Sequence, residues 1–395
     1  MNKKEVKKAP ALRFKGFTND WEQRKLGYEV NFYSGLTYHP DDIRNSGVFV
    51  IRSSNIKNNR LISADNVFVN PQIVNSKPVH INDIVVVVRN GSRKLIGKHV
   101  LIQHELHDTV IGAFMTGIRS SNNFFINATL DSQLFKKEIQ KNLGSTINQI
   151  TVKNFQNMVF GFPSKIEKDK IGKLFRIIDN IISLQQRKLS LIKTLKRSFL
   201  SDLFFKTSTN SIVITLKQVT SIRGGYAFKS KEFTENGYPI IKIANISNNG
   251  EIKGPYSYTN NFNKKYILTK NDIVLAMSGA TTGKIAKLRS SKSFLQNQRI
   301  GYFCKTNNID YNYLYYLLIS DQFKKQLKRI TIAGAQPNVS SLDIENFRFS
   351  VLSSKNKQKK ISDFLNKLDI KIRITNKKIT IFSQLKRSLL NNMFI

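Results

Sequence analysis

The segments that come closest to catalytic or ligand-binding motifs are incomplete. Residues 279–284 read Gly-Ala-Thr-Thr-Gly-Lys, with three residues between the glycines where a nucleotide-binding phosphate loop has four. Ile285 then stands where that loop has the Ser or Thr that holds magnesium. Residues 104–107 read His-Glu-Leu-His, one residue short of the spacing that places two histidines on one helix face. We therefore expect neither a nucleotide site nor a metal site in these segments.

Other catalytic sets are also missing from the sequence. It has no Asn/Asp-Pro-Pro-aromatic tetrapeptide of amino-methyltransferases, and no glycine-rich loop that could hold S-adenosylmethionine. Pro40-Asp41 has no Asp/Glu-x-Lys at a nuclease-like distance downstream, and the lone Cys304 excludes a multi-cysteine zinc site. These absences predict a binding protein with no catalytic, metal or cofactor residues of its own. The enzyme alternative is a nuclease or methyltransferase fused to a recognition domain, but the sequence lacks the motifs of either enzyme.

The charge of the chain indicates what it binds. Its 395 residues carry 64 Lys and Arg against 26 Asp and Glu, a net charge of +38. Residues 1–205 contribute +16 and residues 206–395 contribute +22, so the excess is not confined to a tail. The sequence shows no basic amphipathic helix with an apolar anchor of the kind that binds a membrane surface. We therefore expect a nucleic-acid partner. No apolar run approaches the roughly 18–20 residues of a membrane span, and we expect a cytoplasmic protein.

The two halves of the chain are related by an internal repeat of about 190 residues. The tetrapeptide Leu-Lys-Arg-Ser at 195–198 recurs at 385–388, and Asp179 maps to Asp369 at the same offset. Further matches in the same order are residues 47–56 with 237–246, 82–85 with 271–274, and 135–137 with 323–325. Several matches in one order indicate a tandem duplication.

Each repeat changes its sequence pattern twice. Short β-branched runs punctuated by Asn, Gly and Ser predict strands and turns over 30–125 and 215–305. Helices are predicted next, over 129–143 and 311–329. Each repeat then ends in a long stretch without proline, about 167–204 and 357–394, which predicts a long helix.

The two predicted long helices carry narrow apolar stripes with spacings of three and four, interrupted by Gln185 in the first helix and by Lys371 and Thr375 in the second. The stripe residues are Ile171, Leu174, Ile178, Ile181, Leu189, Ile192, Leu195, Phe199 and Leu203, then Ile361, Phe364, Leu368, Ile379, Phe382, Leu385, Leu389 and Met393. A helix about 55 Å long with so narrow a stripe needs a second helix as its partner. Mutual pairing of the two helices is therefore predicted; the alternative is that each helix packs only on its own domain.

Polar and basic residues cluster in loops that match between the repeats. Lys and Arg supply phosphate affinity, other polar side chains read base edges, and glycine turns let the backbone approach closely. The candidate DNA-binding residues are Tyr38, Arg52, Asn55, Arg89, Ser92, Arg93, Lys94, Lys98, Arg223, Tyr226, Lys242, Asn245, Ser278, Thr281, Thr282, Lys284, Gln336 and Asn338. Ordinary surface-loop chemistry is the alternative for each of them. Because the loops differ between the repeats, two different half-sites are expected.

The start of the chain and its overall plan resemble one family. Residues 12–17 read Leu-Arg-Phe-Lys-Gly-Phe and are followed by Trp21-Glu22 and Leu26. Together with the repeated order of variable domain and long helix, this resembles the specificity subunits of type I restriction-modification systems. The resemblance covers the full chain. It implies double-stranded DNA as partner, two modification subunits that methylate adenine, and restriction subunits that join for cleavage. S-adenosylmethionine, ATP and magnesium would then be used by those partner subunits.

The resemblance and the repeat together predict an α+β fold with a tandem duplication. Two mixed α/β target-recognition domains are separated by two long helices that pair as an antiparallel coiled coil. The expected segments are a first recognition domain at 1–163, a central helix at 164–205, a second recognition domain at 206–352 and a C-terminal helix at 353–395. The implied function is to read a bipartite DNA target on behalf of catalytic partners. A nucleic-acid-binding scaffold without sequence specificity is the alternative.

Overall fold

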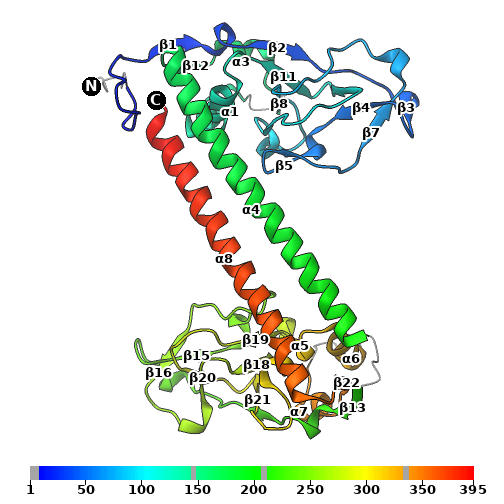
Figure 1. Cartoon of the computed structure of the whole chain (residues 1–395). Helices are drawn as coiled ribbons and strands as arrows, with labels where there is room; N and C mark the ends of the chain where they lie inside the picture. Colours follow the sequence, from blue (N-terminus) through cyan, green and yellow to red (C-terminus); the bar gives the residue numbers. More distant parts are fainter. Residues whose placement is uncertain (1–8, 144–147, 206–210, 332–337) are drawn as a thin grey trace. The chain divides into compact units, whose positions relative to one another are not determined.

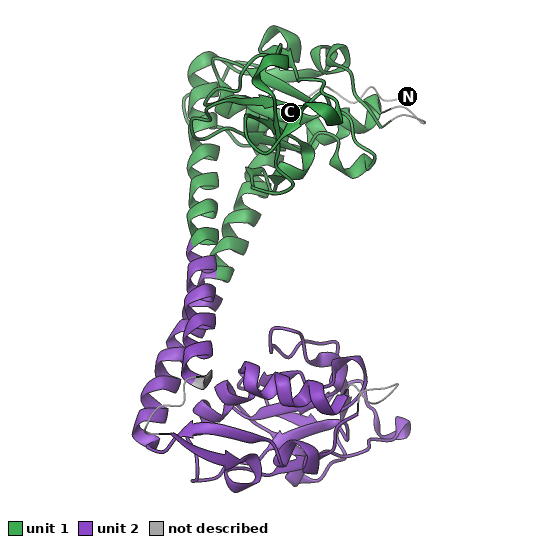
Figure 2. Ribbon diagram, turned by 90° about the vertical axis from the view of Figure 1, so that its right-hand side faces the viewer, with its two compact units in different colours: residues 1–187, 376–395 green, residues 188–375 purple. Residues whose placement is uncertain are grey.

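The chain forms two compact units. The computed structural model describes residues 9–143, 148–205, 211–331 and 338–395. Unit 1 comprises residues 1–187 and 376–395, and unit 2 comprises residues 188–375 (Figure 2). Each unit consists of one β-rich body and one half of each long helix, so the division between the units falls inside the helices.

Unit 1 is built on two four-stranded sheets, with strand orders β10-β4-β7-β3 and β2-β11-β8-β9. Two two-stranded sheets, β1-β12 and β5-β6, complete it. Its strands, labelled in part in Figure 1, are β1 (Glu22–Lys25), β2 (Asn31–Ser34), β3 (Ile43–Arg44), β4 (Val48–Ile51), β5 (Ile56–Lys57), β6 (Arg60–Leu61), β7 (Val67–Val69), β8 (Ile84–Val87), β9 (His99–Leu101), β10 (Thr109–Ile111), β11 (Met115–Arg119) and β12 (Val159–Phe162).

Unit 2 repeats this plan with sheets of order β14-β21-β18-β19 and β16-β15-β20-β17, and with the pair β13-β22. In both units one parallel strand pair, β4 with β10 and β15 with β20, lies among antiparallel neighbours. The strands are β13 (Ser211–Thr215), β14 (Ile222–Gly224), β15 (Tyr238–Ile241), β16 (Ser257–Thr259), β17 (Ile267–Leu268), β18 (Ile273–Ala276), β19 (Ile285–Lys287), β20 (Phe294–Gln296), β21 (Ile300–Phe303) and β22 (Arg348–Leu352). The predicted strand regions are thereby confirmed.

The prediction of one continuous helix over 129–143 and one over 311–329 is wrong, because the structure has two consecutive helices in each of these regions. Unit 1 has α1 (Asn123–Asp131) and α2 (Gln133–Asn142), and unit 2 has α5 (Tyr311–Leu318) and α6 (Asp321–Thr331). Ser132 Oγ accepts a hydrogen bond from Phe135 N–H at 3.2 Å, and Ser320 Oγ accepts one from Phe323 N–H at 3.5 Å. A serine that caps a new helix ends the previous one. Short helices α3 (Val152–Asn157) and α7 (Ser341–Glu345) precede β12 and β22.

The long helices are α4 (Lys165–Phe205) and α8 (Lys355–Met393). Each begins after a serine at equivalent positions, Ser164 and Ser354, whose hydroxyls accept hydrogen bonds from the N–H groups of Glu167 (3.4 Å) and Lys357 (3.5 Å). Buried apolar residues form a core in each unit, and residues of the adjoining helix halves contribute to it. Among the described residues no helix has the length and apolarity to span a bilayer.

The two long helices pair in antiparallel fashion. In unit 1 the end of α8 lies beside the start of α4, where Lys386 Nζ donates to Asp179 Oδ1 at 2.6 Å. In unit 2 the start of α8 lies beside the end of α4, where the Phe199 and Phe364 ring centroids are 4.9 Å apart. The predicted duplicated fold with paired long helices is therefore confirmed.

Two residues of the predicted stripes do not lie in the helix seam. Leu195 is 52% exposed and its counterpart Leu385 is 44% exposed. Ile171 and Leu368, in contrast, are buried as predicted. The stripe expectation is wrong for Leu195 and Leu385, since a two-helix contact covers only a narrow sector and an apolar residue just outside it faces solvent.

Candidate nucleic-acid interface

The predicted loops of unit 1 meet at Ser53, which follows strand β4. Asn90 Nδ2 donates to Ser53 Oγ at 3.0 Å, and Lys98 Nζ donates to the Ser53 carbonyl at 3.1 Å. Burial lowers the pKa of the Lys98 ammonium. The structure therefore brings the loop at 52–55 together with the loop at 89–98, and Lys98 acts as a brace between them.

Asn55 and Asn245 support their loops from inside the protein. Asn55 is fully buried; its Oδ1 accepts from Arg52 N–H at 2.9 Å and its Nδ2 donates to Ala64 O at 2.7 Å. Asn245 repeats this with Lys242 N–H at 2.9 Å and Lys253 O at 2.8 Å. The prediction that these two side chains contact DNA needs correction, because in the described structure their polar atoms hold the loop and do not face solvent.

Exposed cations occupy the tip of the unit 1 loop. Arg89, Ser92, Arg93 and Lys94 are all exposed. The Arg89 guanidinium carbon lies 5.0 Å from the centroid of the Phe114 ring, and one Arg93 nitrogen donates to Leu143 O at 3.4 Å. This tip is the most accessible group of basic residues among the predicted sites of unit 1.

The corresponding loop of unit 2 is shorter and carries fewer cations. Gly97 N–H donates to Val87 O at 2.9 Å in unit 1, and Gly283 N–H donates to Ala276 O at 2.8 Å in unit 2, which makes Lys284 the counterpart of Lys98. Both glycines have positive φ, and a Cβ on either one would touch the neighbouring helix. Ile96 N–H donates to Arg93 O as Thr282 N–H donates to Gly279 O, so Arg93 and Lys94 stand where unit 2 has Gly279 and Ala280, which carry no charge.

The loop of unit 2 carries hydroxyl side chains at this place instead of cations. The Oγ of Ser278 and the Oγ1 of Thr281 are buried without a hydrogen-bond partner among the described residues, while Thr282 Oγ1 donates to Gly279 O at 2.7 Å. Asn338 is exposed and its backbone pairs with Ser278, as that of Gln149 pairs with Arg89 in unit 1. Gln336 lies outside the described residues.

Two further cations of unit 2 are fixed by aromatic rings. The Arg223 guanidinium lies 4.5 Å from the Tyr302 ring centroid and donates to Gln296 Oε1 at 3.2 Å. Lys242 Nζ lies 4.5 Å from the Phe233 ring centroid and donates to Ser257 Oγ at 2.7 Å. These contacts restrict both side chains and leave them half-buried.

Tyr38 and Tyr226 occupy different positions of the repeated first turn. Leu36 N–H donates to Ile111 O at 2.7 Å, and Tyr226 N–H donates to Gln296 O at 3.0 Å, so Leu36 and not Tyr38 is the counterpart of Tyr226. The glycine before each, Gly35 and Gly225, approaches a carbonyl so closely that a Cβ would lie 2.1 Å from its oxygen. The Tyr226 and Phe228 rings meet edge to face, with centroids 4.9 Å apart, and nearby Glu232 raises the pKa of the Tyr226 hydroxyl.

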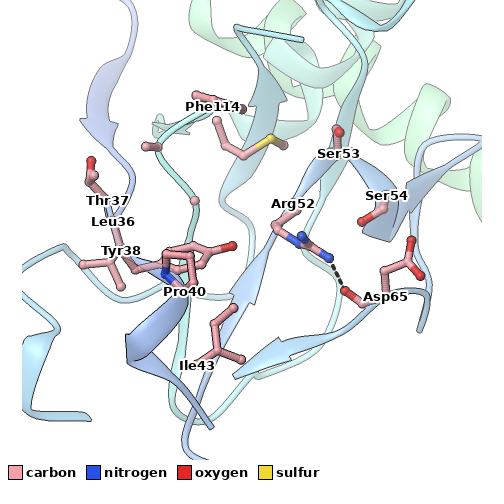
Figure 3. A pocket seen from close by; sticks show the side chains of 13 residues that line it. Leu36, Thr37, Tyr38, Pro40, Ile43, Arg52, Ser53, Ser54, Asp65 and Phe114 are labelled. Carbon is pink, nitrogen blue, oxygen red and sulfur yellow. Dashed lines mark hydrogen bonds between the residues drawn. The ribbon is translucent and has the colours of Figure 1, made fainter. Parts of the chain in front are cut away.

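A pocket of about 560 Å³ opens beside Tyr38 and Arg52 in unit 1 (Figure 3). Its other lining residues are Leu36, Thr37, Pro40, Ile43, Ser53, Ser54, Asp65, Gly112, Ala113, Phe114 and Met115. The sequence offered no signal for Phe114, because an aromatic residue in an apolar run is typical of a core. The structure exposes 53% of it.

A second surface, on the helix side of each unit, is built from duplicated residues. In unit 1, Lys386 Nζ bridges Asp179 and Asp131 at 2.6 Å each, and His99 Nε2 lies 3.3 Å from Asp131 Oδ1. Burial alone raises the pKa of Asp131, but His99 and Lys386 together hold it below its usual range. His99 thus helps to hold the Asp131 carboxylate, a structural role that the sequence did not reveal.

The equivalent pair in unit 2 is Lys196 with Asp369, at 2.5 Å. Here the added partners differ: Tyr316 Oη donates to Asp369 Oδ2 at 3.0 Å, and an Arg289 nitrogen lies 3.7 Å from the same oxygen. Burial and Asp369 raise the pKa of the Tyr316 hydroxyl. The Lys–Asp pair therefore belongs to the part of each unit that the duplication has retained.

A cavity lies over this pair in each unit, about 530 Å³ in unit 1 and about 590 Å³ in unit 2. Exposed arginines at equivalent positions, Arg387 and Arg197, line the two cavities. Exposed apolar residues of the helices recur as well: Leu184, Ile381 and Leu385 in unit 1, and Ile374, Leu191 and Leu195 in unit 2. Each helix side therefore offers the same mixture of apolar and basic groups.

These features define a class: a duplicated α/β protein with basic loops, long paired helices and, among the described residues, no cluster of His, Cys, Asp or Glu that could hold a metal ion. The family model described as type I restriction modification DNA specificity domain matches residues 18–194 and 210–381. The chain belongs to this family.

Known proteins similar to this chain carry the same designation. It is 28% identical over 274 residues to the type I restriction enzyme MjaVIII specificity subunit of Methanocaldococcus jannaschii, covering 63% of this chain and 64% of that protein. It is 23% identical over 235 residues to the StySPI specificity subunit of Salmonella potsdam, covering 57% and 49%. The matches thus span less than two thirds of either relative.

The fold is also similar to that of a solved structure. The crystal structure of a type I restriction-modification S subunit from M. genitalium has a TM-score of 0.72 to this chain, with 18% sequence identity. The likeness covers 98% of this chain and 99% of that one. At this identity it supports the fold.

Proposed function

We propose that this chain reads a bipartite target in double-stranded DNA and directs adenine methylation or DNA cleavage by partner subunits. The loops of unit 1 bind one half-site and the loops of unit 2 bind the other. The chain contributes recognition and no catalysis, and S-adenosylmethionine, ATP and magnesium are used by the partners. Its place of action in this proposal is the cytoplasm.

One observation carries the proposal: the duplication has kept the helix side of the two units and changed the loop side. The Lys386–Asp179 and Lys196–Asp369 pairs recur, as do the exposed arginines Arg387 and Arg197. The loops instead differ in length, charge and hydroxyl content. A pair of surfaces that differ suits two different base sequences, because base edges present different donors and acceptors.

The shared helix side supports the expected partners. Equivalent surfaces bind equivalent structures, so we infer one modification subunit at each, with restriction subunits joining the complex. Exposed Leu and Ile on the helices are residues of the kind that protein partners cover. Arg197→Glu or Arg387→Glu alone should reduce the number of captured modification subunits from two to one, as measured by native mass spectrometry. Arg93→Glu on the loop side is the matched control and should leave two.

Selection of bound fragments from random duplex DNA tests the proposal directly. A bipartite motif with a fixed gap is expected. Enrichment of no motif would favour the alternative, a scaffold that binds phosphates without reading sequence. The selection uses the full chain together with its modification subunits, and a parallel selection with those subunits alone reports any preference of their own.

Loop variants then assign each half-site. Replacing Ser92 with Ala should weaken or relax one half of the motif, and replacing Thr281 and Thr282 with Ala should do so for the other half. Each half-site is expected to respond to one variant only. A motif that changes in both halves with either variant would contradict the assignment of one half-site to each unit.

A further inference from the structure

We propose that the unit 1 pocket beside Tyr38 and Arg52 takes one base that is unstacked from the bound duplex. The inference rests on the proposed DNA binding and adds a ligand for a pocket that the two-half-site model does not require. A protein that pulls a base out of the stack holds it in a pocket that stacks on its faces and bonds to its edge.

The walls of the pocket match the faces of a base. Leu36, Ile43, Phe114 and Met115 supply apolar surface, and Tyr38 supplies a second aromatic ring. Phe114 and Ile43 are 53% and 44% exposed, so this apolar surface meets water in the free protein. Stacking of a base on an aromatic side chain is favourable and tolerates any base, because every base has a π-face.

Arg52 supplies an unused hydrogen-bond donor at the same place. Its backbone N–H donates to Asn55 Oδ1 at 2.9 Å, and its terminal guanidinium nitrogen donates to the Asp65 carbonyl (Figure 3). The Nε–H is buried and has no acceptor among the described residues. A buried donor without an acceptor is unfavourable, so a small movement of the Arg52 side chain that turns this N–H toward the pocket would let the carbonyl or ring nitrogen of a base satisfy it.

The charges around the pocket favour a base that belongs to DNA over an uncharged ligand. The Arg89 guanidinium covers the Phe114 ring at 5.0 Å, and Lys98 is fixed beside Ser53 on the lining. Asp65 is the one acidic residue among those that line the pocket. Cations beside an apolar pocket place the phosphates at its rim and leave the base to enter it.

The equivalent positions of unit 2 lack this combination. Val88 N–H donates to Phe114 O at 3.0 Å and Met277 N–H donates to Arg299 O at 3.0 Å, so Arg299 stands where unit 1 has Phe114. Lys242 replaces Arg52 and offers no Nε–H. We therefore assign the unstacked base to the half-site of unit 1 only.

A mismatch scan tests the proposal. Duplexes carrying the selected motif would each contain one mismatched pair, and their affinity for the full chain in its complex would be measured by fluorescence anisotropy. Extruding a base from a mismatch costs less than extruding it from a paired position. The duplex with its mismatch at one particular position of the unit 1 half-site should therefore bind about tenfold more tightly than the matched duplex. When 2-aminopurine replaces the base at that position, its fluorescence should change on binding.

Two variants and one control locate the effect. Ala113→Trp fills the pocket and Phe114→Ala removes one wall; each should abolish the mismatch gain while the unit 2 half-site is still read. Arg299→Ala, at the position equivalent to Phe114, should leave the gain unchanged. Mismatches that weaken binding at every position of the unit 1 half-site would overturn the proposal and leave the bipartite reading intact.

Other outcomes separate this proposal from the function on which it rests. If Ala113→Trp prevents capture of partner subunits but keeps the mismatch gain, the pocket binds protein and the proposal is wrong. If the random-duplex selection yields no motif, the proposed function fails first, and the base pocket fails with it.

Discussion

The two units of this protein have diverged on one side and not on the other. On the helix side, Lys386–Asp179 in unit 1 and Lys196–Asp369 in unit 2 are the same contact, conserved through the duplication. On the loop side, unit 1 has a cationic tip and an aromatic pocket where unit 2 has hydroxyls and Arg299. The helix side is therefore suited to a purpose common to both units, while each loop side is suited to its own.

Even the retained contact has acquired different surroundings. Asp131 and His99 extend the pair of unit 1 into a buried ionic group, whereas the counterpart of Asp131 is Ile319 and unit 2 adds the Tyr316 hydroxyl. One lysine therefore bridges two carboxylates in unit 1, and one carboxylate has several partners in unit 2.

The largest expected effect comes from removing the two equivalent lysines. Lys386→Met leaves Asp131 and Asp179 without their shared cation, and we expect the free energy of unfolding to fall by about 3–5 kcal/mol. Lys196→Met should cost about 1–3 kcal/mol, because the Tyr316 hydroxyl still donates to Asp369. Chemical denaturation of the full chain measures both. Equal losses would break the comparison, since the added partners would then have no effect.

The two buried asparagines should respond alike. Asn55→Ala and Asn245→Ala each remove a side chain that bonds one backbone N–H and a backbone carbonyl, so each should reduce the free energy of unfolding by about 1–3 kcal/mol. Asn45→Ala, at an exposed asparagine, should change it by less than about 0.5 kcal/mol. A clear difference between the two buried sites would show that the loops are supported differently.

The ionic group of unit 1 should also make stability depend on acid. The pKa of Asp131 is held below its usual range, so its contribution is present above the unfolded-state value of about 3.9 and is lost as the pH falls below it. The free energy of unfolding of the wild type should exceed that of Asp131→Asn by about 2 kcal/mol at pH 7, and this difference should become smaller below about pH 4. Urea denaturation at several pH values measures it. A gap that is constant with pH would contradict the ionic role of Asp131.

The smallest expected effect concerns the cations that only unit 1 has. Arg93→Ala with Lys94→Ala should reduce the slope of log affinity against log salt by about 0.9 for each phosphate contact removed, without changing the preferred sequence. Lys98→Ala should change the slope less, because Lys98 Nζ is bonded to the Ser53 carbonyl. Binding measured across a salt series provides the test, and an unaltered slope in the double variant would remove this tip from the DNA face.

Several features could be predicted because they depend on local pattern. The offset of about 190 residues identified the duplication, and the three-and-four spacing identified the long helices, since periodicity survives in any context. The split at Ser132 was missed because the apolar pattern continues across it, and only the hydrogen bond from Phe135 N–H marks a new helix start. The exposure of Leu195 was not predicted, because an apolar stripe does not reveal how wide a sector of the helix surface the second helix covers.

The candidate site was predictable as a set of loops but not residue by residue. Composition and the repeat offset were enough to show that both halves are basic, that they are copies, and that the loops between strands differ. Only the tertiary structure decided that Asn55 lies inside, that Lys98 braces Ser53, and that Phe114 lies at the surface beside Arg52. The physical reason is that burial and hydrogen-bond partners depend on strands far apart in the chain, and one polar residue serves equally well as a loop support or as a ligand contact until its neighbours are placed.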